Sequence, residues 1–336
     1  MYFYYKRFMC VSLALWFASS CLADSYESSL SPSVFEPLIA ELVVNEGFEA
    51  TQLRQWFKNF QPNAEVLRLI SKPAEALTWD RYRKILIKPK RISEGKIFLQ
   101  KHAAIFEAAE KKFGVDKHIL AAIMGIETSY GKNQGRFLVL ESLSTLAFYY
   151  PPELKRQRAN FFRSELIKFL KLCRDQGWEA DKIKGSYAGA MGMGQFISSS
   201  YQHYAVDFDG DNQIDLFNSI PDAIGSVGNY FKSHGWKNLQ PTAVKLKSPG
   251  ANTIQNTEQG LRKPKLALKT YFDQGALPQK ILSPRWKHDD KAVLYAFTGE
   301  GVPEYWLTTH NFYVITRYNH SPLYAMAAYQ LSEALM

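Results

Sequence analysis

Residues 116–131 read DKHILAAIMGIETSYG, a stretch that predicts one buried helix carrying a single acidic side chain. Asp116 is a favourable N-cap and Gly131 a favourable stop, so we expect the helix to run between them. Glu127 continues, at helical spacing, the apolar stripe formed by Leu120, Ile123 and Met124. Burial on this stripe and the negative end of the helix dipole both oppose ionisation, so the sequence predicts a raised pKa for Glu127.

A carboxylic acid that stays protonated near neutral pH can donate a proton to a leaving oxygen. The alternative, on this helix alone, is a structural Glu paired with a buried Arg or a backbone donor. Residues 128–131 follow as a polar and aromatic turn, where the helix end could meet a cleft.

Two further blocks stand out along the chain, GSYAGAMGMGQFISSSY at 185–201 and NFYVITRYNHSPLYAMA at 311–327. The small residues of the first block let the backbone approach a ligand or a neighbouring helix closely. Tight helix packing explains most of its glycines, and their spacing fits neither a Walker loop nor a dinucleotide fingerprint.

The coarse organisation is mainly α with a strand-rich insertion. Apolar residues fall at helical spacing over 35–113, and further helices are expected over 156–173, 221–234 and 324–335. Between 240 and 300, Pro and Gly separate the short alternating runs AVKLK, LALKTYF and KAVLYAF. The 336 residues are 46% apolar and 22% charged without a low-complexity tract, which indicates a globular protein of two or three domains rather than a disordered one.

The N-terminus has the order of an export signal, which we place at residues 1–23. Lys6 and Arg7 precede an apolar stretch too short to span a bilayer comfortably, and small residues follow. Cleavage after Ala23 and lipidation of Cys21 remain equal alternatives. Beyond the signal only Cys173 is left, so no internal disulfide can form.

The formal net charge of +9 falls to +7 without Lys6 and Arg7, and the cations are scattered along the chain. This balance suits a polyanionic wall polymer. Nucleic acid is not expected as a partner, because no nucleic-acid motif is present.

An acidic loop, DFDGDNQIDLFN at 207–218, has the spacing of a calcium loop in its first nine positions. Its acidic residues are Asp207, Asp209, Asp211 and Asp215. The twelfth position holds Asn218 instead of the bidentate Glu of an EF-hand. The alternative is a solvated acidic turn.

The blocks at 119–135, 185–201 and 311–327 together resemble the lytic murein transglycosylases, specifically the B type, and the resemblance covers nearly all of residues 35–336. It implies a mainly α (α+β) fold with a lysozyme-like helical core at 101–238 plus 305–336. An N-terminal helical domain at 30–100, with parts of 140–180, and a small β-rich domain at 239–304 are expected to complete it.

The resemblance also implies the chemistry. In this family the bond between N-acetylmuramic acid (MurNAc) and N-acetylglucosamine (GlcNAc) is broken without water, which leaves a 1,6-anhydro end on the MurNAc. The single catalytic acid matches Glu127. Most glycosidases need two carboxylates, so the 2-acetamido group of the substrate is expected to assist.

Further site residues follow from the same resemblance. Ser186 and Gln195 match positions bordering the catalytic sugar subsite, and Tyr318, Asn319 and Tyr324 match groove-lining positions. Tyr187 and Tyr130 are weaker candidates, for which a core role is equally plausible. In the acidic loop, the family closes its variant site with a later Asp, matched by Asp222 one residue further on here. The expected structural Ca²⁺ would then be held by Asp207, Asp209, Asp211, Asp222 and the backbone carbonyl of Gln213, and no organic cofactor is expected.

The expected partners are peptidoglycan glycan strands, an outer-membrane lipid anchor through Cys21 and proteins of cell-wall synthesis, in the periplasm of a Gram-negative-type envelope. Two other functions stay open: a lysozyme-type hydrolase and a non-catalytic peptidoglycan-binding protein. A zinc hydrolase is not expected because the seven His form no ligand pair such as HExxH, and no GxSxG elbow indicates a serine hydrolase.

Overall fold

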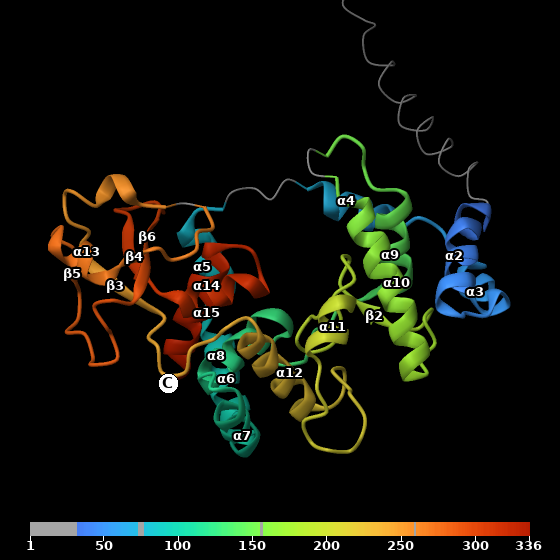
Figure 1. Ribbon diagram of the computed structural model, residues 1–336, viewed down its shortest axis with the longest axis horizontal. Coiled ribbons are helices and arrows are strands. Elements are labelled where there is room, and N and C mark those ends of the chain that lie inside the picture. Colours follow the sequence, from blue (N-terminus) through green and yellow to red (C-terminus); the bar gives the residue numbers. More distant parts are fainter. Residues whose placement is uncertain (1–31, 73–76, 155–156, 259) are drawn as a thin grey trace, which may run out of the picture. The chain divides into compact units, whose positions relative to one another are not determined.

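The structure, a computed structural model, describes residues 32–72, 77–154, 157–258 and 260–336 (Figure 1). The chain divides into two compact units, one ending at Pro62 and the other spanning Asn63–Met336. The expected export signal and Cys21 lie outside the described residues. In the described ranges, no helix combines the length and apolarity needed to cross a membrane.

The first unit is a small helical hairpin. It contains the 3₁₀ helix η1 (Pro32–Phe35) and the helices α2 (Glu36–Glu46) and α3 (Ala50–Phe57). Gly47 takes a left-handed backbone with φ 68° and ends α2, which glycine does at no steric cost. The rings of Phe35 and Phe57 stack at 4.1 Å inside the hairpin.

The second unit is built mainly of helices. They are α4 (Ala64–Ser71), α5 (Trp79–Leu86), α6 (Pro89–Lys101), α7 (Ala103–Phe113), α8 (Lys117–Thr128), α9 (Val139–Phe148), α10 (Ala159–Gln176), α11 (Ser198–Tyr204), α12 (Ile220–Ser233), α13 (Leu268–Asp273), α14 (His310–Tyr318) and α15 (Pro322–Leu335). Helix α8 is buried along most of its length and contacts α6, α7, α12 and α15, so the quoted stretch lies at the centre of this core (Figure 1).

The strands lie in two sheets. β1 (Phe137–Leu138) pairs with β2 (Lys184–Gly185). The other strands are β3 (Ala243–Ser248), β4 (Leu266–Ala267), β5 (Leu277–Pro278), β6 (Lys291–Phe297) and β7 (Glu304–Thr308), and they form an antiparallel sheet in the order β4-β6-β7-β3-β5. An apolar cluster that includes Leu246, Leu268 and Leu294 packs on this sheet. The short helix η2 (Ile254–Asn256) also lies in this part of the chain.

The predicted fold class, mainly α with a small β-rich part, is confirmed, while the proposed domain boundaries stay a prediction. One run was assigned wrongly: LALKTYF forms only the two-residue strand β4 before turning into α13. Leu268 and Tyr271, three residues apart, are both buried, so helical spacing prevails over alternation. Strand β7 and helix α14 were not predicted.

The stop of α8 also differs from the prediction. The helix ends at Thr128, because Ser129 and Tyr130 take left-handed φ values of 51° and 62° before Gly131. The amide of Tyr130 donates back to the carbonyl of Met124 at 3.0 Å, which satisfies a carbonyl in the last turn. The predicted N-cap is confirmed, since Asp116 accepts a hydrogen bond from the amide of His118 at 2.8 Å.

Helix α5 connects the sheet to the helical core. The amide of Trp79 donates to the carbonyl of Thr298 at 2.8 Å, and Asp80 accepts from the amide of Glu300 at 2.7 Å. Helix α5 also contacts α15. The β6–β7 hairpin therefore fixes the position of a helix that packs within the core.

Candidate active site

Glu127 lies in the last turn of α8 and is partly buried. Burial raises the pKa of its carboxyl from 4.5 to about 7, while a hydrogen bond from Tyr324 acts in the opposite direction. Among the described residues, neither a cation nor a second carboxylate contributes to this shift. The raised pKa predicted from the apolar stripe is therefore present, and the alternative of a Glu paired with a buried Arg does not fit.

Three tyrosines surround the carboxylate. The hydroxyl of Tyr324, on α15, donates to Oε1 of Glu127 at 2.5 Å. Burial raises the pKa of Tyr318, at the end of α14, and of Tyr82, on α5, and the negative charge of Glu127 raises both further. The acid thus lies near three neutral tyrosines, of which Tyr324 donates a hydrogen bond to it.

The glycine-rich block is joined to this site by hydrogen bonds. The hydroxyl of Thr128 donates to the carbonyl of Met193 at 2.8 Å, and that of Tyr318 donates to the carbonyl of Gly194 at 2.5 Å. Gln195 follows with a φ of 52° and its side-chain amide donates to Gly192 and Gln134 carbonyls, both at 3.0 Å. These hydrogen bonds hold the segment at 192–195 against the end of α8 and against Tyr318.

The glycines of this block mainly serve close packing, as the sequence indicated. A Cβ on Gly192 would lie 2.6 Å from the carbonyl oxygen of Leu216, and one on Gly189 would lie 2.5 Å from the side chain of Leu143. Both glycines also have positive φ values. Any side chain there would displace backbone or core atoms.

The other predicted residues take different places. Ser186 is partly buried, and its hydroxyl accepts hydrogen bonds from the amides of Ala188 at 3.3 Å and Ala190 at 3.0 Å. Tyr187 is partly buried in the same turn, and Asn319 is exposed directly after α14.

Tyr130 has the core role that the sequence left open. Its hydroxyl donates to the carbonyl of Arg91 at 2.8 Å, and a Cβ on Gly95 or Gly125 would collide with its ring. The residue is buried between α6 and α8, so its position favours packing over substrate binding.

Tyr82 was missed by the sequence reasoning. It lies in WDRYRKIL, a polar helix outside the three motif blocks. No local pattern places this helix beside α8, because its position depends on the β6–β7 hairpin more than 200 residues away in sequence, as the bond from Glu300 to Asp80 with a separation of 220 shows.

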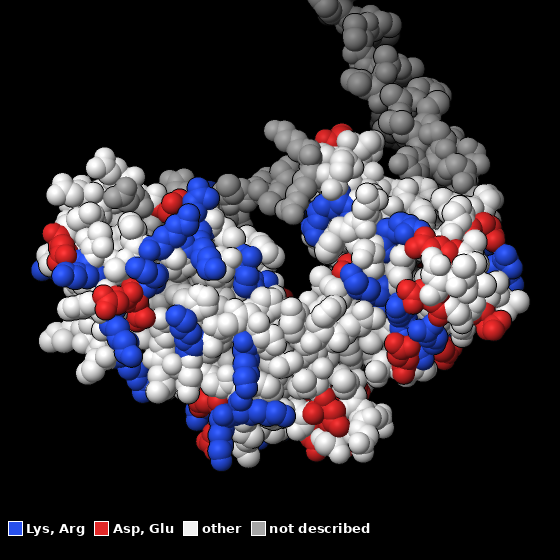
Figure 2. All heavy atoms as spheres, in the orientation of Figure 1, with Lys and Arg blue, Asp and Glu red and all other residues white. Residues whose placement is uncertain are grey.

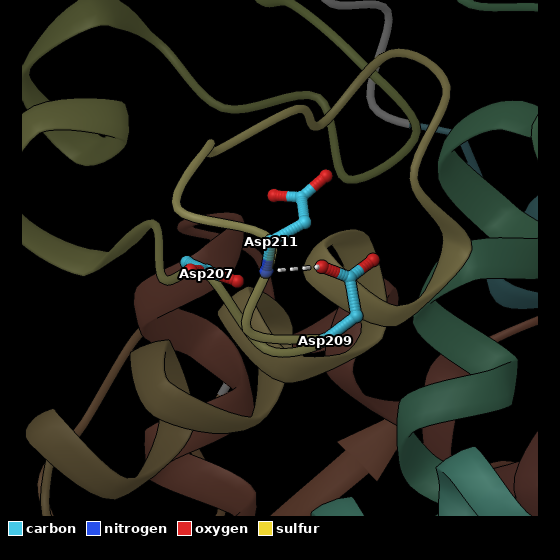
Figure 3. A group of neighbouring side chains, drawn as sticks. All are labelled: Asp207, Asp209 and Asp211. Atoms are coloured by element: carbon cyan, nitrogen blue, oxygen red, sulfur yellow. Dashed lines mark hydrogen bonds between the residues drawn. The ribbon is translucent and has the colours of Figure 1, made fainter.

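The acidic loop brings three of its predicted ligands together. Carboxylate oxygens of Asp207, Asp209 and Asp211 lie within 4.8 Å of one another (Figure 3). Such a set of hard oxygen donors fits Ca²⁺. Asp222 is buried at the start of α12 and its two oxygens accept from the amides of Phe208 at 2.7 Å and Asp215 at 2.8 Å. The carboxylate of Asp222 therefore holds the loop through two of the loop's backbone amides.

Comparisons with known proteins identify the family. A family model described as the transglycosylase SLT domain matches residues 33–333. The chain belongs to this family. The "membrane-bound lytic murein transglycosylase B" of Escherichia coli (strain K12) is 37% identical over 312 residues, which cover 89% of this chain and 82% of that protein.

Solved structures of lytic transglycosylases share the fold. The soluble lytic transglycosylase SltB1 of Pseudomonas aeruginosa superposes with a TM-score of 0.80 at 41% identity, covering 88% of this chain and 96% of that one. An Escherichia coli lytic transglycosylase in complex with calcium gives 0.79 at 37% identity, with 89% and 91% covered. SltB3 of Pseudomonas aeruginosa in complex with NAG-NAM-pentapeptide gives 0.79 at 30% identity, with 91% and 80% covered.

The chain is therefore a peptidoglycan lytic transglycosylase with a lysozyme-like fold. Lys and Arg side chains are scattered over the visible face, including the β-rich part, with Asp and Glu side chains among them (Figure 2). Residues 239–304 hold ten Lys or Arg against six Asp or Glu. This segment of the lytic transglycosylase therefore has a net positive charge of +4.

Proposed function

We propose that this lytic transglycosylase cleaves the MurNAc-β-1,4-GlcNAc bond without water and that Glu127 acts first as the acid and then as the base. The observation that carries the proposal is the carboxyl of Glu127, whose pKa of about 7 is set by burial and tuned by the hydroxyl of Tyr324. At neutral pH both protonation states are populated, as a group that first gives and then takes a proton requires.

In the first step, protonated Glu127 donates its proton to the glycosidic oxygen between MurNAc C1 and GlcNAc C4. The C1–O bond breaks, the GlcNAc leaves with a 4-hydroxyl, and the 2-acetamido carbonyl oxygen of the MurNAc forms a bond to C1. The positive charge moves into the resulting oxazolinium ring. The carboxylate of Glu127 is then stabilised by the hydrogen bond from Tyr324.

In the second step, the carboxylate of Glu127 takes the proton of the MurNAc 6-hydroxyl. The oxygen attacks C1 and the bond from C1 to the acetamido oxygen breaks, which restores the acetamide and closes the 1,6-anhydro ring. Glu127 is protonated again and no water is consumed. Attack within one sugar is favoured over attack by free water when the sugar is held in the right pose.

The single-carboxylate route is supported by the surroundings of Glu127. Two-carboxylate glycosidases hold their pair roughly 5–9.5 Å apart, a distance at which one charge affects the other. Among the described residues, no second carboxylate affects the titration of Glu127. Assistance by the substrate's own acetamido group supplies what a second carboxylate would.

Ser186 is suited to orient that acetamido group. Its oxygen already accepts from two backbone amides, so its own proton remains to be donated. We assign Gln195, Tyr318, Asn319 and Tyr187 to the surrounding glycan contacts. SltB3, which shares this fold, is known in complex with NAG-NAM-pentapeptide, and this supports peptidoglycan strands as the ligand.

Digestion of purified peptidoglycan by wild type and Glu127→Gln, with the products read by mass spectrometry, tests the proposal. We expect anhydro products from wild type, each lighter by one water than a reducing end, and none from Glu127→Gln. Glu107→Gln, an exposed Glu on α7 that pairs with Lys117 at 3.5 Å, is the matched control and should retain activity. Reducing ends from wild type would instead indicate a lysozyme-type hydrolase. Equal cleavage by Glu127→Gln would exclude Glu127 as the acid, and no cleavage by either protein would favour a binding protein.

A structural Ca²⁺ in the loop at 207–222 is the second part of the proposal. Asp207, Asp209 and Asp211 would hold the ion, with the backbone carbonyl of Gln213. Asp222 is proposed as a further ligand, and its two oxygens also accept hydrogen bonds from backbone amides of the loop. The ion would stabilise the segment that precedes α12, and the calcium complex of the Escherichia coli relative supports this assignment.

We also propose export to the periplasm, with either a soluble form or an outer-membrane anchor through Cys21, and contact there with cell-wall synthesis proteins. The curated relative of Escherichia coli is described as membrane-bound, which supports the anchored form. Mass spectrometry of the mature N-terminus distinguishes a lipidated Cys21 from cleavage after Ala23.

A further inference from the structure

A second concave site lies between the sheet and α15. Two adjoining pockets, of 370 and 620 Å³, share Ala243, Ser283, Trp286, Tyr329 and Glu333 in their linings. We call the joint space the sheet groove. Neither pocket is lined by Glu127, Tyr82, Tyr318 or Tyr324. Both volumes lie in the ~300–1,000 Å³ range of ligand-binding clefts.

Aromatic rings form part of the groove, and the polar groups of two of them are already hydrogen-bonded. The indole N–H of Trp306 donates to Glu304 at 3.2 Å, and the hydroxyl of Tyr329 donates to the carbonyl of Ala243 at 3.0 Å. Trp286 is partly exposed and its inner side packs on the apolar cluster of the sheet. Trp306 and Tyr329 therefore offer ring faces rather than hydrogen-bond donors to a ligand, and Trp286 adds a partly exposed ring.

The charged side chains of the groove balance one another. Four cations line it, namely Arg83, Lys245, Lys280 and Arg285, against the four carboxylates of Glu110, Asp116, Glu304 and Glu333. Glu304 pairs with Lys245 at 2.9 Å and lies 3.9 Å from Arg83. Although the β-rich part as a whole is basic, the groove selects neither an anion nor a cation. Ring faces beside polar groups without net charge suit an uncharged, polyhydroxylated ligand, because each pyranose has an apolar face and hydrogen-bonding edges.

We propose that the sheet groove binds a segment of peptidoglycan glycan strand outside the catalytic site, so that the enzyme holds its polymeric substrate at a second point. The proposal rests on the peptidoglycan activity proposed above and adds a second site at which the enzyme contacts the glycan strand. The groove shares two helices with the catalytic site. Helix α5 carries Arg83 next to Tyr82, and α15 carries both Tyr324 and Tyr329.

A second contact of this kind increases the effective concentration of polymer at the active site. It does not strengthen the binding of a short fragment that reaches only the active site. Trp286→Ala should therefore leave the turnover of a short tetrasaccharide within about twofold of wild type. On intact sacculi it should raise KM about tenfold, the fold-change of losing a ring contact worth ~1.4 kcal/mol. The kcat on sacculi should stay unchanged.

Two further variants keep the test decisive. Ser283→Leu narrows both pockets from an exposed position without removing a core contact, so it should reproduce the loss even if Trp286→Ala unfolds. Trp56→Ala, at a partly exposed Trp of α3 that lines neither pocket, should have no effect. Equal losses on fragment and sacculi, or no loss with Ser283→Leu, would overturn the proposal.

A binding measurement separates this inference from the proposed reaction. Glu127→Gln protein, with and without Ser283→Leu, is titrated with glycan strands from which an amidase has removed the peptides, and with free stem peptide. We expect weaker glycan binding in the double variant and no competition by the peptide. This result holds even if the cleavage proves hydrolytic. Displacement of the glycan by stem peptide would overturn the assignment of the groove to glycan.

Discussion

Replacing Glu127 by Gln should stabilise the protein above neutral pH while it abolishes catalysis. The carboxyl has a pKa of about 7 in the folded chain against an ordinary value of 4.5. Below pH 4.5 both states are protonated and the carboxyl imposes no penalty. Between 4.5 and 7 the unfolded chain loses the proton first, so stability falls as the pH rises, and the loss is complete above 7.

The magnitude follows from the shift. The pKa of Glu127 is higher by about 2.5 in the folded chain, and each pKa unit is equivalent to ~1.36 kcal/mol. The difference therefore corresponds to about 3 kcal/mol of unfolding free energy. Gln does not titrate, so we expect the stability of Glu127→Gln relative to wild type to increase by about 3 kcal/mol between pH 4 and pH 8. Urea unfolding of both proteins at the two pH values measures the difference.

The control is Glu107→Gln, at an exposed carboxylate of α7, for which the difference from wild type should change by under ~0.5 kcal/mol over the same range. A stability difference between wild type and Glu127→Gln that is the same at pH 4 and pH 8 would refute the reasoning. It would mean that the carboxyl is solvated in the folded protein, and the acid role would lose its physical basis.

Three other perturbations have defined outcomes. Tyr324→Phe removes the hydrogen bond that lowers the pKa of Glu127, so the alkaline limb of the rate profile should move to higher pH; an unmoved limb would show that the bond has no effect. Calcium should raise the melting temperature of wild type above that in chelator, and Asp209→Asn should reduce this increase; no increase in wild type would argue against the site. Gly125→Ala should destabilise the fold by ~1–3 kcal/mol in denaturant unfolding, because the new Cβ would lie 2.6 Å from the ring of Tyr130. Stabilisation by up to ~1 kcal/mol, as in an open helix, would contradict that contact.

Local patterns predicted the features that depend on neighbours in sequence. The cap at Asp116 and the buried stripe that includes Glu127 follow from residues within one helix, and both are present. The end of the same helix was placed too late, because Ser129 and Tyr130 adopt left-handed backbones that their side chains do not favour. Contacts of Tyr130 with α6 and of Thr128 with Met193 hold this turn, and neither is visible in the helix sequence.

Features that depend on distant contacts were predicted less well. The bond from Tyr324 to Glu127 joins residues 197 positions apart, and only the resemblance of the motif blocks placed Tyr324 near the groove. Tyr82 had no motif around it and was missed. Helix α13 was read as a strand because Leu266 and Leu268 alternate, although the burial of Leu268 and Tyr271 follows helical spacing.

The hydrogen bond between α15 and α8 has a consequence for how the enzyme comes into being. A chain still under synthesis, or a fragment that lacks α15, contains Glu127 and most of the core but not the tyrosine that holds the carboxylate. Its Glu127 lacks both the packing of α15 and the hydrogen bond from Tyr324. With Glu127 as the proposed acid, the ability to cut glycan strands is therefore acquired late, after the β-rich segment and α15 have been made and have folded back onto a helix made long before them.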